Sequence, residues 1–194
     1  MRSFVFGNGR SRLNIKFEEL RPYGKIYACN AVYREYTPDY LISVDPKMIV
    51  EIESTGYQLR HQVWTNPNSR YKDFKGFNYF SPSLGWSSGP TALQLATSHG
   101  ADEIYIFGFD YSGINGLLNN VYGDTPNYKK NSEPATFHGN WTRQTETVIK
   151  SNKKIKYFRV VERNYHDPQW QYPNFRHITY ESLREIMSSW AKTA

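Results

Sequence analysis

The stretch Ser3-Phe4-Val5-Phe6-Gly7-Asn8-Gly9-Arg10-Ser11 joins a short apolar run to a glycine-rich turn. Phe and Val in an uninterrupted run are typical of a strand buried on both faces. The two glycines of the turn let backbone N–H groups approach an anion closely, and Ser11 adds a hydroxyl. The turn is therefore suited to bind phosphate, although an ordinary strand-to-loop turn explains the glycines equally well.

The turn is not a standard dinucleotide fingerprint. The pattern G-x-G-x-x-G needs a third glycine where this chain has Arg12, and the phosphate-binding motif G-x-x-x-x-G-K-[ST] occurs nowhere in the sequence. The usual NAD-binding and P-loop interpretations are therefore excluded.

Similar apolar runs recur along the chain and alternate with helical patterns. Segments rich in Val, Ile, Tyr and Phe lie at 3–6, 25–29, 40–44, 62–65, 76–80, 103–109 and 155–161, and segments with helical signatures lie at 46–54, 90–98, 141–151 and 180–192. Alternating strands and helices predict an α/β fold with an open, mostly parallel twisted sheet and helices on both faces.

Length and composition limit the class of protein. The chain has 194 residues, 39% of them hydrophobic, which predicts one domain over residues 1–194. No apolar stretch is long enough to span a membrane and no secretory signal is present, and the single cysteine, Cys29, lies in an apolar run. We therefore expect a buried thiol, a reducing compartment and a cytoplasmic protein.

The charge points to an anionic partner. A net charge of +6 is compatible with nucleic acid, a nucleotide or an acidic glycan. The basic runs at 129–130 and 153–154 are too short to favour nucleic acid, and scattered solvated Lys and Arg would explain the same charge. The oligomeric state cannot be inferred from these features.

Polar residues follow several of the predicted strands. Ligands of open α/β sheets bind beyond the carboxyl ends of the strands, so we expect these residues to line one crevice. They are the turn at 7–11, Asn30, Asp45, and the run Gly108, Asp110 and Tyr111. We also expect the run Ser87-Ser88-Gly89, which opens a helix, to face this crevice and offer free N–H groups to an anion, unless Ser88 or Gly89 only caps the helix.

His138 lies in a glycine-flanked loop just before a predicted helix. A partly neutral imidazole can accept a proton from a hydroxyl, which makes His138 a candidate general base. A surface or capping histidine is the alternative. The sequence gives no indication of a metal site, because it has no H-E-x-x-H motif, no paired cysteines and no Asp-x-Asp. We expect no cofactor.

Taken in order, these motifs resemble the bacterial sialyltransferases that have a single Rossmann-like nucleotide domain, and their uncharacterised phage and microbial relatives. The resemblance runs to about Val161. It rests on a Gly-Asn-Gly-x-Ser turn, a Cys-Asn pair, a Ser-Gly helix start, a Gly-x-Asp strand end and a histidine before the last long helix, matched by Gly7 to Ser11, Cys29-Asn30, Ser88-Gly89, Gly108 to Asp110, and His138.

The resemblance implies a metal-independent transfer of sugar from a nucleotide donor such as CMP-sialic acid to a glycan acceptor. Asn8, Asn30, Ser88 and Gly89 would hold the nucleotide, and His138 would deprotonate the acceptor. Two tyrosines bind the leaving phosphate in this family.

Two departures from the family pattern concern the phosphate. The first tyrosine falls at Ser112, and the second would be Tyr122 or Tyr128. Asp45 stands where the family has asparagine, and a carboxylate is better suited to ribose hydroxyls than to phosphate.

Other functions remain open. A non-catalytic nucleotide-binding or nucleotide-sugar-binding protein would use the same crevice. A pterin-type pyrophosphokinase would need Asp45 and Asp110 as magnesium ligands, and a basic nucleic-acid module would use the charge alone. The segment after Glu162 matches no motif and would cover the sheet edge or form an interface.

Overall fold

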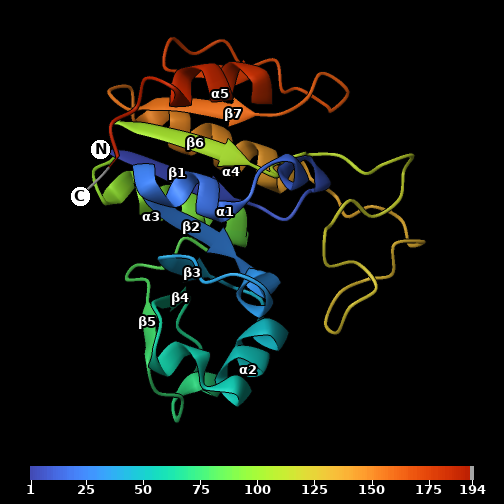
Figure 1. Ribbon diagram of the computed structural model, residues 1–194. Coiled ribbons are helices and arrows are strands. Elements are labelled where there is room, and N and C mark those ends of the chain that lie inside the picture. Colours follow the sequence, from blue (N-terminus) through green and yellow to red (C-terminus); the bar gives the residue numbers. More distant parts are fainter. Residues whose placement is uncertain (193–194) are drawn as a thin grey trace.

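A computed structural model describes residues 1–192 as a sheet with helices packed on it (Figure 1). The sheet has eight strands in the order β5-β4-β3-β2-β1-β6-β7-β8, and every neighbouring pair is parallel. The strands are β1 (Arg2–Phe6), β2 (Lys25–Cys29), β3 (Tyr40–Ile42), β4 (Val63–Thr65), β5 (Phe77–Tyr79), β6 (Glu103–Phe107), β7 (Lys156–Val160) and β8 (Phe175–Ile178). The predicted α/β fold with an open parallel sheet is confirmed.

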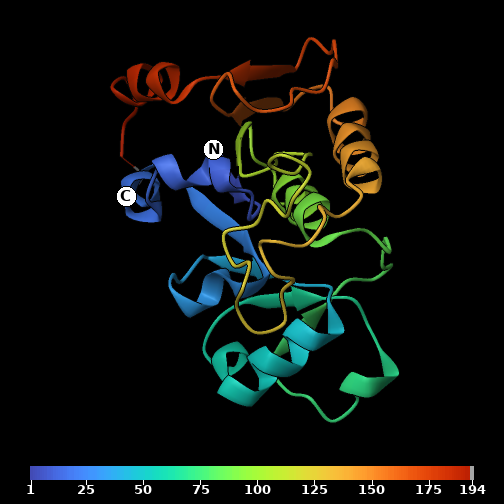
Figure 2. The same ribbon diagram turned by 90° about the vertical axis from the view of Figure 1, so that its right-hand side faces the viewer.

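The α-helices cover both faces of the sheet, as the two views in Figures 1 and 2 show. They are α1 (Phe17–Leu20), α2 (Pro46–Thr55), α3 (Ser88–Ser98), α4 (Gly139–Ser151) and α5 (Tyr180–Met187). Short 3₁₀ helices are η1 (Arg10–Asn14), η2 (Arg21–Tyr23), η3 (Asn30–Arg34), η4 (Tyr57–Leu59) and η5 (Ser69–Tyr71). None of the helices in residues 1–192 combines the length and the apolar character that a membrane crossing requires.

Strand β1 shows why the sequence forms two cores. Phe4 and Phe6 pack into a core with α1, α2 and α5, whereas Val5 packs into a second core with α3 and α4. Successive side chains of a strand point to opposite faces, so a strand covered on both sides needs an apolar residue at every position. This explains the uninterrupted apolar run at the start of the chain.

Helix α2 begins at the predicted residue, Pro46, and ends at Thr55, one residue beyond the predicted end. Asp45 is the N-cap and accepts a hydrogen bond from the Lys47 N–H at 2.9 Å, and Pro46 occupies the first turn. The helix stops at Gly56, whose φ of 69° is in the left-handed region that glycine adopts readily.

The C-terminal part differs from the prediction. The sequence does not predict strand β8, because Phe175-Arg-His-Ile contains no apolar run. This strand has one buried residue and forms the edge of the sheet beside β7. Helix α5 ends at Met187 instead of continuing to 192. The chain leaves the helix there, and the Trp190 ring packs 5.1 Å from that of Tyr105.

Candidate functional site

A pocket of about 120 Å³ lies at the carboxyl ends of β1 and β2. Its lining residues come from five separate segments and are Gly7, Asn8, Cys29, Asn30, Ser87, Ser88, Gly89, Asn120 and Trp141. The glycine-rich turn and the start of α3 therefore face one pocket, as the strand-end rule predicts. The long loop after β6 projects from this edge of the sheet (Figure 1).

The glycines of the turn are needed for a close approach of two loops. The Gly7 N–H donates to the Phe107 carbonyl at 2.8 Å, and the Gly9 N–H donates to the Gly108 carbonyl at 3.0 Å. A Cβ on Gly9 would come within 2.4 Å of a carboxylate oxygen of Asp110, and Gly108 has a φ of 68°. The expectation that these N–H groups receive an anion is therefore wrong for Gly7 and Gly9, which join β1 to β6.

Asp110 and Ser11 also serve this junction. Asp110 is 3% exposed and accepts hydrogen bonds from the Ser11 N–H at 3.1 Å, from the Ser11 hydroxyl, and from the Asn119 side-chain amide at 2.9 Å. The Arg10 N–H donates to Asn119 Oδ1 at 2.9 Å. The Ser11 hydroxyl is consequently hydrogen-bonded within the protein. The expectation that this hydroxyl faces a phosphate is not met.

The start of α3 offers free donors to the pocket. The Ser88 and Gly89 N–H groups are the first two of the helix and make no hydrogen bond within residues 1–192. Ser87, the N-cap, makes no side-chain capping bond. Unpaired N–H groups and the positive end of the helix dipole favour an anion at this position.

Two asparagines line the pocket in fixed orientations. Asn8 donates from Nδ2 to the Cys29 carbonyl at 3.0 Å, and its buried Oδ1 has no partner in the part of the chain that the structure describes. Asn30 has a φ of 55°, and its Oδ1 accepts from the Ser43 hydroxyl at 2.8 Å and the Ser88 hydroxyl at 3.1 Å. The Asn8 Oδ1 is thus a buried acceptor that no described donor satisfies.

Trp141 and Asn120 line the pocket but were not predicted. Trp141 lies on Gly89, where an added Cβ would meet the indole ring at 2.7 Å, and its buried Nε1 has no partner among the described residues. The spacing from His138 to Trp141 is three residues, which places both on one side of a helix start and could have indicated Trp141. No sequence signal marks Asn120.

His138 lies immediately before α4 and stacks on Trp141, with ring centroids 6.2 Å apart and an interplanar angle of 24°. It is half-buried and is not itself in the pocket lining. Burial lowers the pKa of His138, against the opposing charge of Asp110. The imidazole is therefore neutral at pH 7, the form that accepts a proton.

The predicted nucleotide-binding residues Tyr111 and Ser112 of the loop after β6 lie outside the pocket lining. Tyr111 is 6% exposed, has a φ of 54°, and packs edge-on against Phe109 and Trp141. The Ser112 hydroxyl donates to the Asp110 carbonyl at 3.4 Å. Both residues serve the packing of the loop.

Tyr122 and Tyr128 also use their hydroxyls within the protein. The Tyr122 hydroxyl accepts from Arg12 at 3.1 Å, and the Tyr128 hydroxyl accepts from the Ala31 N–H at 3.3 Å, one residue after Asn30. Burial raises the pKa of Tyr122 to about 12, with the charge of Arg12 opposing. Tyr128 thus borders the pocket region without lining the pocket.

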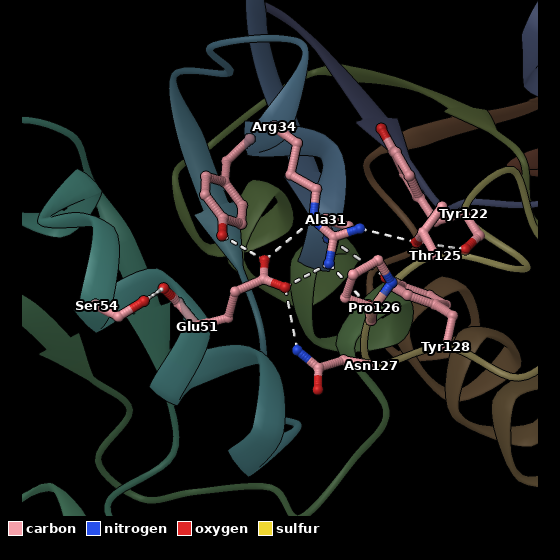
Figure 3. A network of polar contacts seen from close by, with 10 residues as sticks. Ala31, Arg34, Glu51, Ser54, Tyr122, Thr125, Pro126, Asn127 and Tyr128 are labelled. Carbon is pink, nitrogen blue, oxygen red and sulfur yellow. Dashed lines mark hydrogen bonds and ion pairs between the residues drawn. The ribbon is translucent and has the colours of Figure 1, made fainter.

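A polar network joins this loop to η3 and α2 (Figure 3). Arg34 of η3 pairs with Glu51 of α2, donates to the Thr125 hydroxyl at 2.8 Å, and donates to the Pro126 carbonyl at 2.8 Å. Asn127 donates to Glu51 at 3.1 Å. Burial alone would raise the pKa of Glu51, but the hydrogen bonds from Arg34 and Tyr33 outweigh it and lower that pKa.

The remaining candidates have structural surroundings. Asp45 is exposed, caps α2 and does not line the pocket. Burial raises the pKa of the Cys29 thiol to about 12, against the field of Arg12, so the thiol is protonated and a poor nucleophile. Within residues 1–192, no group of three or more His, Cys, Asp and Glu side chains is arranged to hold a metal ion.

Comparison with known proteins finds a solved structure whose fold is similar to that of this chain. No family model matches the sequence, and no curated protein matches it. Among solved structures, a mutant of the α-2,3/8-sialyltransferase CstII is similar, with a TM-score of 0.52 and 16% sequence identity over 82% of this chain and 81% of that chain. The chain therefore shares the fold of a sialyltransferase.

Proposed function

We propose that this protein is a glycosyltransferase that uses a nucleotide-activated sugar, with a donor resembling CMP-sialic acid and no metal ion. The observation that carries the proposal is the free Ser88 and Gly89 N–H groups, which share one pocket with the side chains of Asn8 and Asn30. This pocket is at the carboxyl edge of a parallel sheet, where α/β proteins bind their ligands. The similarity to a sialyltransferase fold supports the same conclusion.

Each part of the pocket fits one part of a nucleotide. The start of α3 would bind the phosphate and stabilise the charge that grows on it as the sugar leaves. Asn8 Oδ1, buried and without a partner, would accept a hydrogen bond from a ribose hydroxyl. The volume of about 120 Å³ is below the roughly 300–1,000 Å³ typical of pockets for whole drug-sized ligands, so the base and the sugar would extend beyond it.

His138 would act as the general base. Its neutral imidazole would take the proton of the acceptor hydroxyl while the sugar passes from the donor phosphate to that oxygen. The acceptor would be a glycan, and the leaving nucleotide would carry the electron pair of the broken bond.

The test pairs binding with turnover. A thermal-shift screen with CMP, UMP, UDP, GDP and ATP identifies the nucleotide, since a ligand at 100 times its Kd adds about 2.7 kcal/mol to the free energy of unfolding. Nucleotide affinity by calorimetry and nucleotide release from a panel of donor sugars are then measured for wild type and His138→Ala. We expect a fall in turnover of about 100- to 10,000-fold with nearly unchanged affinity. Equal turnover in both proteins would refute the role of His138.

A second candidate is a non-catalytic protein that binds a nucleotide or nucleotide sugar. It is favoured by the engaged hydroxyls of Tyr122 and Tyr128 and by Ser112 at a position where a tyrosine would bind the phosphate. Tight binding without release from any donor would establish this candidate. A pyrophosphokinase is less favoured, since Asp45 and Asp110 already accept hydrogen bonds from the protein.

A further inference from the structure

Arg12 carries a buried charge that has no direct counter-ion. It belongs to η1, directly after the pocket turn, and is 3% exposed. Its guanidinium lies 5.9 Å from the centre of the Phe17 ring and 5.6 Å from that of Tyr122. Among the described residues 1–192, it makes one side-chain hydrogen bond, from Nη2 to the Tyr122 hydroxyl at 3.1 Å, and its buried Nε has no partner there.

No carboxylate among residues 1–192 lies within salt-bridge distance of Arg12. Two other arginines of this chain are paired: the buried Arg159 lies 2.5 Å from Asp167, and the partly buried Arg34 pairs with Glu51. A guanidinium does not lose its proton in a protein, so Arg12 cannot escape the cost of burial by becoming neutral.

The groups around Arg12 do not compensate its charge directly. The Tyr122 hydroxyl and the Cys29 thiol both stay protonated at neutral pH, because burial raises each pKa to about 12. The buried carboxylate of Asp110 takes its hydrogen bonds from Ser11 and Asn119 instead of from Arg12. The positive charge therefore acts on its surroundings through the protein interior.

The pocket lies within the reach of this field. The Arg12 N–H donates to the Gly9 carbonyl at 3.3 Å, and η1 therefore begins within two residues of Asn8, which lines the pocket. Cys29, whose thiol is influenced by the charge of Arg12, is one of the lining residues. Charges interact more strongly across a protein interior than through water, so a buried cation here favours an anion in the pocket.

We propose that Arg12 is a positioning residue that strengthens binding of an anionic ligand, the phosphate of a nucleotide, through its field and without touching the ligand. Arg12 is not in the pocket lining, which separates this role from that of the Ser88 and Gly89 N–H groups. The inference rests on the proposed nucleotide function, and it adds an electrostatic source for phosphate affinity behind the pocket wall.

The experiment compares a charged and an uncharged ligand. Kd values for CMP, cytidine and inorganic phosphate are measured by calorimetry for wild type, Arg12→Met and Arg12→Lys, and Tm is measured for each protein. Lys72→Met, which removes an exposed charge, is the control for net charge. We expect Arg12→Met to weaken the binding of CMP and of phosphate by about 10-fold and to leave the Kd of cytidine unchanged. Its Tm should stay at or above the wild-type value. Arg12→Lys retains the charge and should retain most of the CMP affinity.

The outcomes separate this proposal from the proposed function. If Arg12→Met loses affinity for CMP and cytidine equally, or lowers Tm while the ratio of the two affinities stays unchanged, Arg12 is a structural residue and the inference is overturned. If Arg12→Met does not fold, Arg12→Gln, which can still donate to Tyr122, takes its place; failure of both to fold would also overturn it. If the wild-type protein binds phosphate but no nucleotide, the nucleotide function is refuted, and the phosphate affinities still test the role of Arg12. If the wild-type protein binds neither phosphate nor nucleotide, the proposed function and the inference are both overturned.

Discussion

Replacement of Arg34 by Met tests whether the network that joins the loop after β6 to η3 and α2 holds this loop in place. Met preserves most of the aliphatic length of the side chain and removes the charge. The variant loses the ion pair with Glu51 and the hydrogen bonds to the Thr125 hydroxyl and the Pro126 carbonyl (Figure 3). It also leaves the Glu51 carboxylate without its cation.

The expected cost follows from the partial burial of this pair. The side chains of Arg34 and Glu51 are 22% and 19% exposed. Removal of one partner costs about 3–5 kcal/mol in a fully buried pair, whereas an exposed pair contributes about 0–1 kcal/mol. Solvent reaches part of this network, so we expect a loss of about 2–3 kcal/mol in the free energy of unfolding. For a chain of this size that lowers Tm by about 4–12 °C.

The assay is thermal and urea unfolding followed by circular dichroism. Lys25→Met is the matched control, because the Lys25–Asp39 pair has the 3.1 Å separation that Arg34 Nε has from Glu51, but a lysine that is 58% exposed. We expect the control to lose less than about 1 kcal/mol. If Arg34→Met costs no more than Lys25→Met, the network does not anchor the loop and the reasoning is wrong.

Three further outcomes follow from the site. Turnover should hold at neutral pH and fall only below the ordinary titration range of histidine, because burial lowers the pKa of His138 and its neutral form persists down to that pKa; initial rates across pH test this, and a rate that rises toward acid would contradict it. Gly89→Ala should cost about 1–3 kcal/mol and change the fluorescence of Trp141, since its methyl group would meet the indole at 2.7 Å; an unchanged spectrum and Tm would refute this packing. Cys29 should react with a thiol reagent only after unfolding, and fast labelling of the native protein would show that its burial is misjudged.

The sequence predicts those features that depend on local patterns. The apolar run of β1 and the proline and glycine that bound α2 each specify an element with few neighbours involved. The meeting of the glycine turn with the start of α3 also follows from a general rule for parallel sheets.

The rest depends on partners that are distant in the chain. Whether the Gly7 N–H is free for a ligand depends on the Phe107 carbonyl, one hundred positions away. The hydroxyls of Ser11 and Tyr122 are likewise engaged by Asp110 and Arg12, which no local pattern shows. Strand β8 is stabilised by pairing with β7 and not by its own composition.

The central claim is that the pocket at the start of α3 binds the phosphate of a nucleotide. The most direct measurement is a crystal structure of the complex with the nucleotide that gives the largest thermal shift. We expect phosphate density within hydrogen-bond distance of the Ser88 and Gly89 N–H groups, with a ligand hydroxyl near Asn8 Oδ1. A saturated complex whose nucleotide lies elsewhere, or whose phosphate faces away from α3, would contradict the claim.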